Sequence, residues 1–441
     1  MTARTGSFPT AVVVTIGDEL LSGETVDENQ ATLAAFATAH GFDVVSAHTL
    51  PDDTDAIART LTGLRGRCRL CLVAGGLGPT KDDKTRRAVA QALGVALQRR
   101  PELVAHLEAC FARLGRSMPP ANLVQANLPE GAEVLENRLG TAAGFVAGDG
   151  PAYVVLPGPP RELRHVLAEA VRPRMAALGG RPRRATRRYR CLGLGESSLA
   201  ARAEPVLERL ARSFSAYPFH VHYRAAMPRV DVTLVFETDD PPPPDVLRAF
   251  DDALAAVLAP ALYGIGAAGL AARILAALSA AGETLATAES CTGGRVATEI
   301  TAVPGASAVF TGGAVTYADA AKRQRLGVAR TDLERHGAVS EPVARAMAEG
   351  ARSAFDATYA VATTGIAGPS GGSREKPVGT VWIAAASPDG TTAKRLRLHG
   401  EREAIQHAAA GWALKYLWDR LVADDLARVT HRDDDAQKAA S

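Results

Sequence analysis

Apolar runs rich in β-branched residues alternate with amphipathic stretches along the first part of the chain. The runs AVVVTIG, DVVSAHTL, RLCLVAGG, AAGFVAG and AYVVLPG are typical of strands. Between and after them, the pattern predicts helices near Asn29–His40, Thr54–Leu64, Thr85–Leu93 and Arg161–Leu178. Because strands that alternate with helices usually pair in parallel and are covered on both faces, we predict one α/β domain over residues 1–175.

The pattern changes twice after this domain. Residues 180–260 are predicted to form a small α+β linking module, with strands in RRYRCLGLGE, HVHYRA and RVDVTLVFET. Residues 262–423 return to strands (TLATAE, GGAVTYA, TYAVATTG, TVWIAAAS) that alternate with helices, which predicts a second α/β domain. The polar tail, residues 424–441, is expected to be disordered. The predicted fold class is α/β, with a parallel-sheet N-terminal domain, a small α+β middle module and a C-terminal α/β domain.

Composition narrows the class of protein. The chain has 441 residues, and its formal charge of +2 argues against nucleic acid or an anionic membrane as an obligatory partner. We expect no signal peptide and no membrane span, because no apolar run is long enough. Five scattered cysteines suit a reducing compartment. We therefore expect a cytoplasmic protein, with a homodimer as the expected assembly, although the sequence does not define the oligomeric state.

One glycine pattern imitates a dinucleotide-binding fingerprint. Gly264-Ile-Gly266-Ala-Ala-Gly269 matches G-x-G-x-x-G and opens a predicted helix. Glu289 follows at the spacing of ~20 residues that is expected for a ribose-binding acid. The preceding segment, VLAPALY, however, carries Pro260 where a central parallel strand would stand. We therefore interpret the pattern as a domain linker at the start of a helix.

Four loops of the N-terminal domain follow predicted strands, namely Gly17–Gly23, Leu50–Thr54, Gly75–Thr85 and Leu156–Pro160. In an open parallel sheet, the carboxyl ends of the strands line the ligand crevice. Glycines there allow backbone N–H groups to approach a phosphate. The candidate substrate-binding residues are Gly75, Gly76, Gly78 and Gly158.

The same loops carry carboxylates, which are hard oxygen ligands for a divalent cation. Asp52 and Asp83 are candidate catalytic residues, and the candidate metal ligands are Asp83, Asp82, Asp18 and Glu19. The simpler alternative is that these residues only form turns and cap helices.

The N-terminal loops resemble the molybdopterin-binding domain family, in which a Gly-Gly-x-Gly loop precedes a functional Asp at the position of Asp83, and a Pro-Asp loop matches Asp52. The strings GDELLSGETVDEN, GGLGPTKDDKT, ENRLGTAAGF and LPGPPRE are similar to the N-terminal half of the CinA family over residues 11–175. That resemblance implies a metal-dependent ADP-ribose pyrophosphatase, with Mg, Mn and Co not distinguished. Thr141-Ala-Ala-Gly144 departs from the family, which usually has Pro before this Gly.

The C-terminal domain contains two neighbouring potential nucleophiles, Ser290 and Cys291, at a strand-to-helix turn. No His of this domain stands in an obvious triad context, whereas Lys322 lies five residues past Tyr317 on the helix after strand GGAVTY. A desolvated Lys beside a Tyr hydroxyl can act as the base for a serine. Backbone N–H groups at the helix entrance are candidate anion donors, namely those of Thr292, Gly293 and Gly294. The alternative is that Ser290 merely caps the helix.

A long Gly-rich loop, Thr363–Gly372, and the start of the last helix are expected to converge on the same place. They add the candidate substrate-binding residues Thr364, Gly365, Gly368, Lys376 and Arg402. A flexible connection without a binding role is the alternative for the loop.

The strings TAESCTGG, GGAVTYADAAKRQRLGV, TTGIAGPSGGSREKPVGTVWIA and GERE resemble the nicotinamide-nucleotide amidohydrolase domain, the C-terminal half of CinA proteins, over residues 268–420. The resemblance implies that Ser290, Tyr317 and Lys322 are catalytic and that the substrate is nicotinamide mononucleotide, converted without a cofactor to nicotinate mononucleotide and ammonia. Asp319 and Gln406 depart from the family, which usually has Asn and Arg there. Two alternatives stay open: a nucleotide sensor or competence and DNA-damage accessory protein without turnover, and molybdopterin binding by the N-terminal half.

Overall fold

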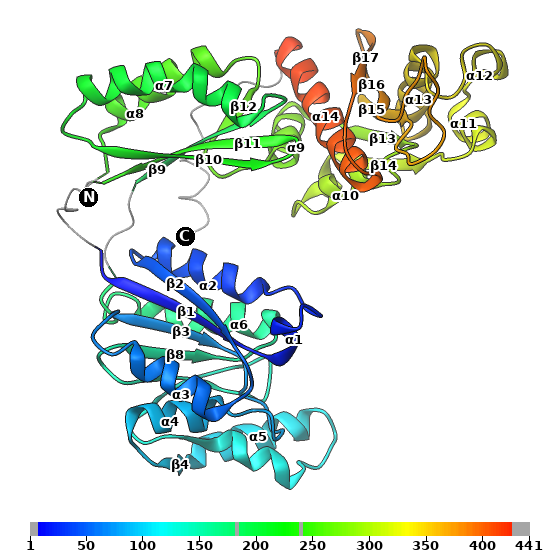
Figure 1. Cartoon of the computed structure of the whole chain (residues 1–441). Coiled ribbons are helices and arrows are strands. Elements are labelled where there is room, and N and C mark those ends of the chain that lie inside the picture. Colours follow the sequence, from blue (N-terminus) through cyan, green and yellow to red (C-terminus); the bar gives the residue numbers. More distant parts are fainter. Residues whose placement is uncertain (1–7, 181–184, 238–240, 426–441) are drawn as a thin grey trace. The chain divides into compact units, whose positions relative to one another are not determined.

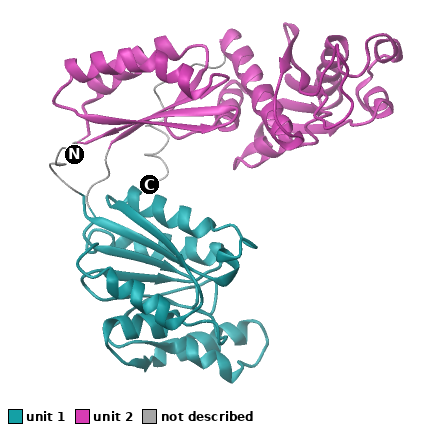
Figure 2. Ribbon diagram, viewed as in Figure 1, with its two compact units in different colours: residues 1–183 teal, residues 184–441 magenta. Residues whose placement is uncertain are grey.

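The structure is a computed structural model of the chain, and it describes residues 8–180, 185–237 and 241–425. The chain divides into two compact units, Met1–Arg183 and Arg184–Ser441 (Figure 2). The part of the expected disordered tail from residue 426 onward lies outside the described residues. The α/β class that the sequence predicts is confirmed, since both units contain parallel strands together with helices.

The first unit is built on a six-stranded sheet in the order β2-β1-β3-β8-β7-β6 (Figure 1). Its strands are β1 (Thr10–Ile16), β2 (Asp43–Leu50), β3 (Leu70–Ala74), β6 (Glu133–Leu135), β7 (Gly144–Ala147) and β8 (Ala152–Leu156). The four strands from β2 to β8 pair in parallel, whereas β7 and β6 pair antiparallel. The two antiparallel strands depart from the predicted parallel pairing, because the short connection between β7 and β8 leaves no room for a crossover helix.

Helices cover both faces of this sheet. They are α1 (Asp18–Leu21), α2 (Glu28–Ala39), α3 (Thr54–Gly63), α4 (Thr85–Leu93), α5 (Pro101–Arg113), α6 (Pro160–Val166) and the short turns η1 (Pro120–Ala126), η2 (Leu167–Val171) and η3 (Arg172–Arg174); β4 (Leu97–Arg99) and β5 (Asn127–Pro129) form a separate pair. Alternate residues of β1 enter different cores: Val12 and Val14 pack on one face, Ala11 and Val13 on the other. The helix predicted over Arg161–Leu178 is instead divided into α6, a π-helical turn and a 3-10 turn.

The second unit begins with a four-stranded antiparallel sheet in the order β10-β11-β9-β12, with α7 and α8 on one face (Figure 1). Its elements are β9 (Thr186–Leu192), α7 (Glu196–Ser213), β10 (Phe219–Ala226), β11 (Arg229–Phe236), α8 (Pro244–Leu258) and β12 (Leu262–Ile265). Gly264 lies inside β12, which is an edge strand antiparallel to β9. The glycine pattern at this position therefore does not follow a central parallel strand, as a dinucleotide fingerprint would.

The rest of the second unit is a five-stranded sheet in the order β14-β13-β15-β16-β17. Its strands are β13 (Leu285–Glu289), β14 (Phe310–Val315), β15 (Tyr359–Gly365), β16 (Thr380–Ser387) and β17 (Gly390–Arg397). Its helices are α9 (Leu270–Ala281), α10 (Arg295–Thr301), η4 (Ala306–Ala308), α11 (Asp319–Leu326), α12 (Arg330–His336), α13 (Glu341–Ala354) and α14 (Arg402–Ala423). The strand β17 was not predicted; its mostly polar sequence, GTTAKRLR, is half exposed and lies at the sheet edge.

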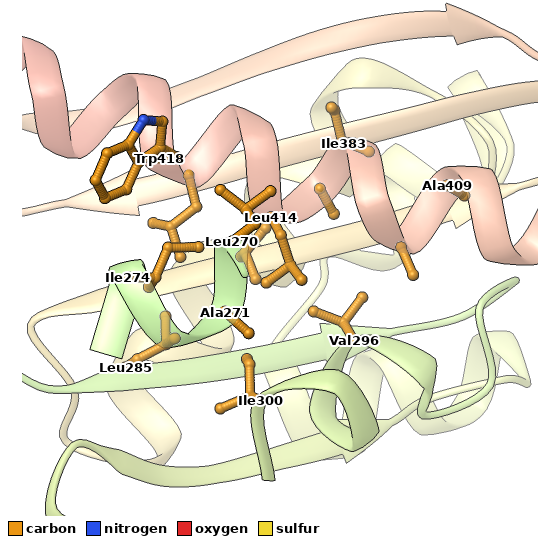
Figure 3. Close-up of a cluster of buried hydrophobic side chains, with 14 of the residues drawn as sticks. Leu270, Ala271, Ile274, Leu285, Val296, Ile300, Ile383, Ala409, Leu414 and Trp418 are labelled. Carbon is orange, nitrogen blue, oxygen red and sulfur yellow. The ribbon is translucent and has the colours of Figure 1, made fainter. Parts of the chain in front are cut away.

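The main core of this part lies between the sheet and three helices. Figure 3 shows Ile274 of α9, Val296 and Ile300 of α10 and Leu414 of α14 gathered in this cluster. A second cluster, centred on α13, covers the opposite face of the sheet. Both clusters include residues of β13 and β15, so the loops at the carboxyl ends of these strands start from strands that are packed on both faces. Across the described ranges, every helix is too short or too polar to cross a lipid bilayer.

Candidate functional site

A cavity of about 270 Å³ opens in the second unit where three neighbouring parallel strands, β13, β14 and β15, reach their carboxyl ends. The residues that the sequence suggested for the amidase and that line this cavity are Ser290, Tyr317, Lys322, Thr364, Gly365, Gly368 and Arg402. The first and last of them, Ser290 and Arg402, are more than 100 positions apart along the chain. Parallel pairing brings them together, because the loops after parallel strands emerge at one edge of the sheet.

Lys322 is a buried cation of this cavity. Only 1% of its side chain is exposed, and its Nζ donates to the backbone carbonyl of Tyr317 at 3.1 Å. Asp319 forms an ion pair with Nζ at 3.5 Å. Burial lowers the pKa of Lys322 from its ordinary value, while the charge of Asp319 opposes that shift. The neutral amine that a general base requires is therefore easier to reach than in water.

Tyr317 and Arg402 close one side of the cavity. The Arg402 guanidinium donates to the Tyr317 hydroxyl at 2.6 Å and to the carbonyl of Gly368 at 2.7 Å. We expected the Tyr317 hydroxyl beside the amine of Lys322. In the structure the Tyr317 hydroxyl instead accepts a hydrogen bond from Arg402, and Lys322 donates to the backbone carbonyl of Tyr317. Arg402, at the first position of α14, thus ties two loops together at the mouth of the cavity.

The two potential nucleophiles have different surroundings. Ser290 lines the cavity, and its backbone N–H is held by the carbonyl of Thr363 at 3.0 Å. Cys291 also borders the cavity, but it packs into the main hydrophobic cluster as well, where burial raises the pKa of its thiol to about 12. A thiol with this pKa stays protonated at neutral pH and is a poor nucleophile, which leaves Ser290 as the better candidate.

A second cavity, of about 410 Å³, lies in the first unit at the carboxyl ends of β1, β2, β3 and β8. The suggested residues that line it are Glu19, Asp52, Gly75, Gly76, Asp82, Asp83 and Gly158. The close approach of these loops requires glycine at one position in particular. Gly75 has φ +108°, and a Cβ there would lie 2.3 Å from the carbonyl oxygen of Ile16.

Both oxygens of the Asp83 carboxylate accept hydrogen bonds from residues of the same loop. One oxygen accepts from the Gly78 amide at 2.6 Å, and the other accepts from the amide and hydroxyl of Thr80 at 2.8 and 2.6 Å. Gly78 does not line the cavity, and its amide is bound to Asp83. Arg86, 4% exposed, holds the same loop through the carbonyls of Leu77 and Gly78 at 2.6 and 2.8 Å. Asp83 therefore organises the Gly-rich loop at the rim of the cavity.

The acidic residues crowd Asp52. Burial raises the pKa of Asp52, and the charges of Asp18, Glu19 and Asp83 add to the shift. The Asp18 and Asp52 carboxylates also accept from each other's backbone amides, at 3.3 and 3.2 Å, so Asp18 stands beside the cavity rather than in its lining.

A metal would relieve the repulsion around Asp52, but the side chains are not arranged as a ligand set. Within residues 8–180, 185–237 and 241–425, no three His, Cys, Asp or Glu side chains come together as metal ligands. We therefore derive no reaction step through a metal from this arrangement.

Residues 267–421 match the CinA C-terminal domain, and residues 12–177 match a family described as a probable molybdopterin binding domain. A CinA-like protein of Anaeromyxobacter sp. (strain Fw109-5) is 43% identical over 409 residues, which cover 92% of this chain and 97% of that protein. The chain belongs to the CinA family. The resemblance stated on the sequence motifs is confirmed.

Two further proteins are similar to this chain. A CinA-like protein of Synechococcus sp. (strain CC9902) is 39% identical over 417 residues, which cover 93% of this chain and 98% of that protein. The crystal structure of the competence/damage inducible protein CihA from Agrobacterium tumefaciens is 43% identical, with a TM-score of 0.34, and covers 35% of this chain and 93% of that chain.

Some of the residues suggested for this CinA-family chain do not line the cavity of the second unit. The amide of Gly294 donates to Glu289 at 2.9 Å, and that of Gly293 donates to the carbonyl of Ser290 at 3.2 Å. Thr292 is 1% exposed, with its hydroxyl bound to Glu289 and Thr363. The expected anion-binding turn needs correction at Gly293 and Gly294, because the amides of these two residues already have partners inside the protein. Lys376 likewise points elsewhere, donating from Nζ to the carbonyl of His336 at 2.7 Å.

Other lining residues were not singled out as site residues. Ala338 and Val339 line the cavity of the second unit, and the Thr364 hydroxyl donates to the Ala338 carbonyl at 2.8 Å. Two apolar residues in a loop carry no chemical signal, so no motif identifies them. In the first unit, Asp27 and Asn29 line the cavity, and Asn29 donates to the Gly158 carbonyl at 2.7 Å. Both belong to the string GETVDEN, whose polar residues after the first strand could have identified them, but the sequence analysis selected only Asp18 and Glu19 from this region.

Proposed function

We propose that the C-terminal domain hydrolyses the carboxamide of nicotinamide mononucleotide to the carboxylate and ammonia. One observation supports this above the others: a single small cavity contains a serine and a buried lysine whose pKa is lowered by that burial. A serine with a desolvated lysine base is a known arrangement for acyl transfer. Arg402 and the Thr364–Gly368 loop border the same cavity and are suited to hold the nucleotide phosphate.

The reaction follows from the placement of these groups. The hydroxyl of Ser290, or a water molecule that it orients, attacks the carboxamide carbon while Lys322 accepts the proton of the attacking group. The tetrahedral centre collapses with loss of the amine, which takes that proton and leaves as ammonia. If Ser290 attacked directly, water then hydrolyses the ester, with its proton passing to the lysine and the serine regenerated. No group of the protein changes its redox state.

Ammonia release from the purified full-length protein with nicotinamide mononucleotide tests this proposal. Wild-type turnover with loss in Ser290→Ala supports it, whereas Cys291→Ala should retain activity. Tight binding of the nucleotide without any ammonia would instead favour the sensor alternative. Activity that survives Ser290→Ala would remove serine from the mechanism.

As a second function, we propose that the N-terminal domain hydrolyses the pyrophosphate bond of ADP-ribose or a similar nucleotide. The supporting observation is the cavity at the carboxyl edge of four parallel strands, bordered by Gly75, Gly76 and Gly158 and by carboxylates. Requirement for a divalent cation stays a prediction. ADP-ribose hydrolysis measured with Mg²⁺, with Mn²⁺ and in excess chelator tests it. Binding of molybdopterin without ADP-ribose hydrolysis would favour the molybdopterin alternative.

A further inference from the structure

Glu289 is a buried carboxylate that the proposed mechanism does not use. It is the last residue of β13, directly before Ser290, and it is 1% exposed. A buried carboxylate is costly unless hydrogen bonds replace its water. Four donors do so here: the Thr292 hydroxyl at 2.6 Å and the amides of Gly294, Val296 and Ala297 at 2.9, 3.1 and 2.8 Å.

These hydrogen bonds cap the N-terminus of α10. The first amides of a helix have no partner within the helix, and an Ncap side chain normally satisfies one of them. The Ncap residue here is Gly294, which has φ 98° and no side chain to offer. The Glu289 carboxylate reaches across the turn and supplies that cap, and its negative charge at the positive end of the helix adds to the stabilisation.

The consequence falls on Ser290. The hydrogen bonds from the amides of Gly294 and Ala297 to the Glu289 carboxylate join the two ends of the turn from residue 289 to 297. Ser290 is the first residue within this turn. On either side, the strand neighbours hold the backbone: Ser290 N–H donates to the Thr363 carbonyl at 3.0 Å, and Thr316 N–H donates to the Glu289 carbonyl at 2.8 Å. The side-chain bonds are therefore what determines how the turn leaves the sheet, and with it the direction of the serine hydroxyl.

We propose that Glu289 is a positioning residue for the hydrolysis, which holds Ser290 in its reactive orientation by capping α10 from within the sheet. This inference rests on the proposed amidase function. Because Glu289 occupies amides at the entrance of α10, these amides are not free for the anionic part of a substrate, and Arg402, which lines the same cavity, is the candidate to hold it.

The test compares Glu289→Gln with Glu299→Gln in the full chain. Glu299 lies on the same helix α10 but pairs with Arg229 and does not line the cavity, so it is the matched control. Gln retains the shape of Glu289, yet its NH2 group cannot accept from the amide donors. We expect Glu289→Gln to lower kcat for ammonia release about 100-fold with KM changed less than about threefold, and Glu299→Gln to behave as wild type. Circular dichroism and a melting curve verify folding at the assay temperature, and Glu289→Asp, which retains the charge, replaces Gln if that variant does not fold.

A second readout needs no carboxamide: the rate at which a fluorophosphonate probe labels Ser290, located by peptide mass spectrometry. We expect slower labelling in folded Glu289→Gln. If the wild type releases ammonia and folded Glu289→Gln has the same kcat, or loses activity only through KM, the positioning role is wrong and the proposed function stands. If the wild type releases no ammonia, the proposed function fails, and labelling alone decides. Equal labelling in both proteins, or none at Ser290 in either, then overturns the positioning role as well.

Discussion

The two cavities of this chain are made in the same way and are chemically opposite. Both lie where neighbouring parallel strands end, in the first unit at β1, β2, β3 and β8 and in the second at β13, β14 and β15. In the second unit burial acts on a lysine and lowers the pKa of Lys322, which favours a base. In the first unit burial and like charges act on a carboxylate and raise the pKa of Asp52, which favours the protonated form of its carboxyl group. The edge of a parallel sheet therefore supplies the place, and the identity of the desolvated group decides the chemistry.

Removing the lysine should break this contrast most strongly. Lys322→Ala should lower kcat for ammonia release by roughly 1,000-fold or more, because the base is lost. Lys322→Arg should be as inactive, since a guanidinium does not give up its proton in proteins. The matched control is Lys394→Ala, whose ammonium lies over the Trp412 ring at 5.0 Å and outside the cavity. Ammonia release close to the wild-type rate in Lys322→Ala would rule out a lysine base.

Changing the acidic loop should affect only the first cavity. Asp83→Asn should lower ADP-ribose hydrolysis by about 100-fold, because an amide cannot accept all three bonds from Gly78 and Thr80. Ammonia release should stay unchanged. Asp53→Asn is the control, since Asp53 caps α3 through the Ala56 amide and Asn is an equally good cap. Parallel loss of both activities in Asp83→Asn would show that the two cavities are not independent.

The charge of Asp319 should set the pH at which the second cavity works. The active form of a lysine base is neutral, so kcat rises with pH through the pKa of Lys322, and burial places that rise below the pH of an ordinary lysine. Asp319 raises this pKa, and Asp319→Asn should therefore move the rise to lower pH. The kcat profile from about pH 6 to about pH 10 measures the displacement. A displacement to higher pH would contradict the assigned role of the ion pair.

The smallest effect should follow from Cys291. Since burial raises the pKa of its thiol to about 12, Cys291 carries almost no thiolate at neutral pH. Cys291→Ala should change kcat for ammonia release less than about threefold, and iodoacetamide should leave the wild type active. Rapid inactivation by iodoacetamide, with the label on Cys291, would show that the buried thiol is reactive and would contradict the assignment of Ser290 as the better nucleophile.

The convergence of the loops could be predicted from the sequence because it depends only on strand order and direction. Alternating strands and helices predict parallel pairing, which places Asp52 and Asp83 at one edge and Ser290 and Thr364 at another. The mixed edges could not be predicted as well. The short strand β6 and the polar strand β17 lack the long apolar runs of the central strands, and β7 was predicted as a strand but not as an antiparallel one.

The hydrogen-bond partners of the site residues could not be predicted from the sequence. Lys376 and Lys322 are both lysines next to suggested motifs, yet Lys376 donates to the His336 carbonyl outside the cavity and Lys322 is buried within it. The glycine-rich turn after Ser290 suggested free amides for an anion, and Glu289 occupies the amide of Gly294.

The sequence by itself thus determined the α/β class, the membership of the CinA family, and which loops meet at each sheet edge, since strand periodicity and motif spacing are local properties of the chain. The tertiary structure alone decided which groups are desolvated and what satisfies them: Lys322 with the Tyr317 carbonyl, Glu289 with the entrance of α10, and Asp83 with its own loop. The physical reason is that burial and hydrogen-bond saturation depend on atoms brought in from distant segments, and these conditions set the pKa and the orientation on which chemistry depends.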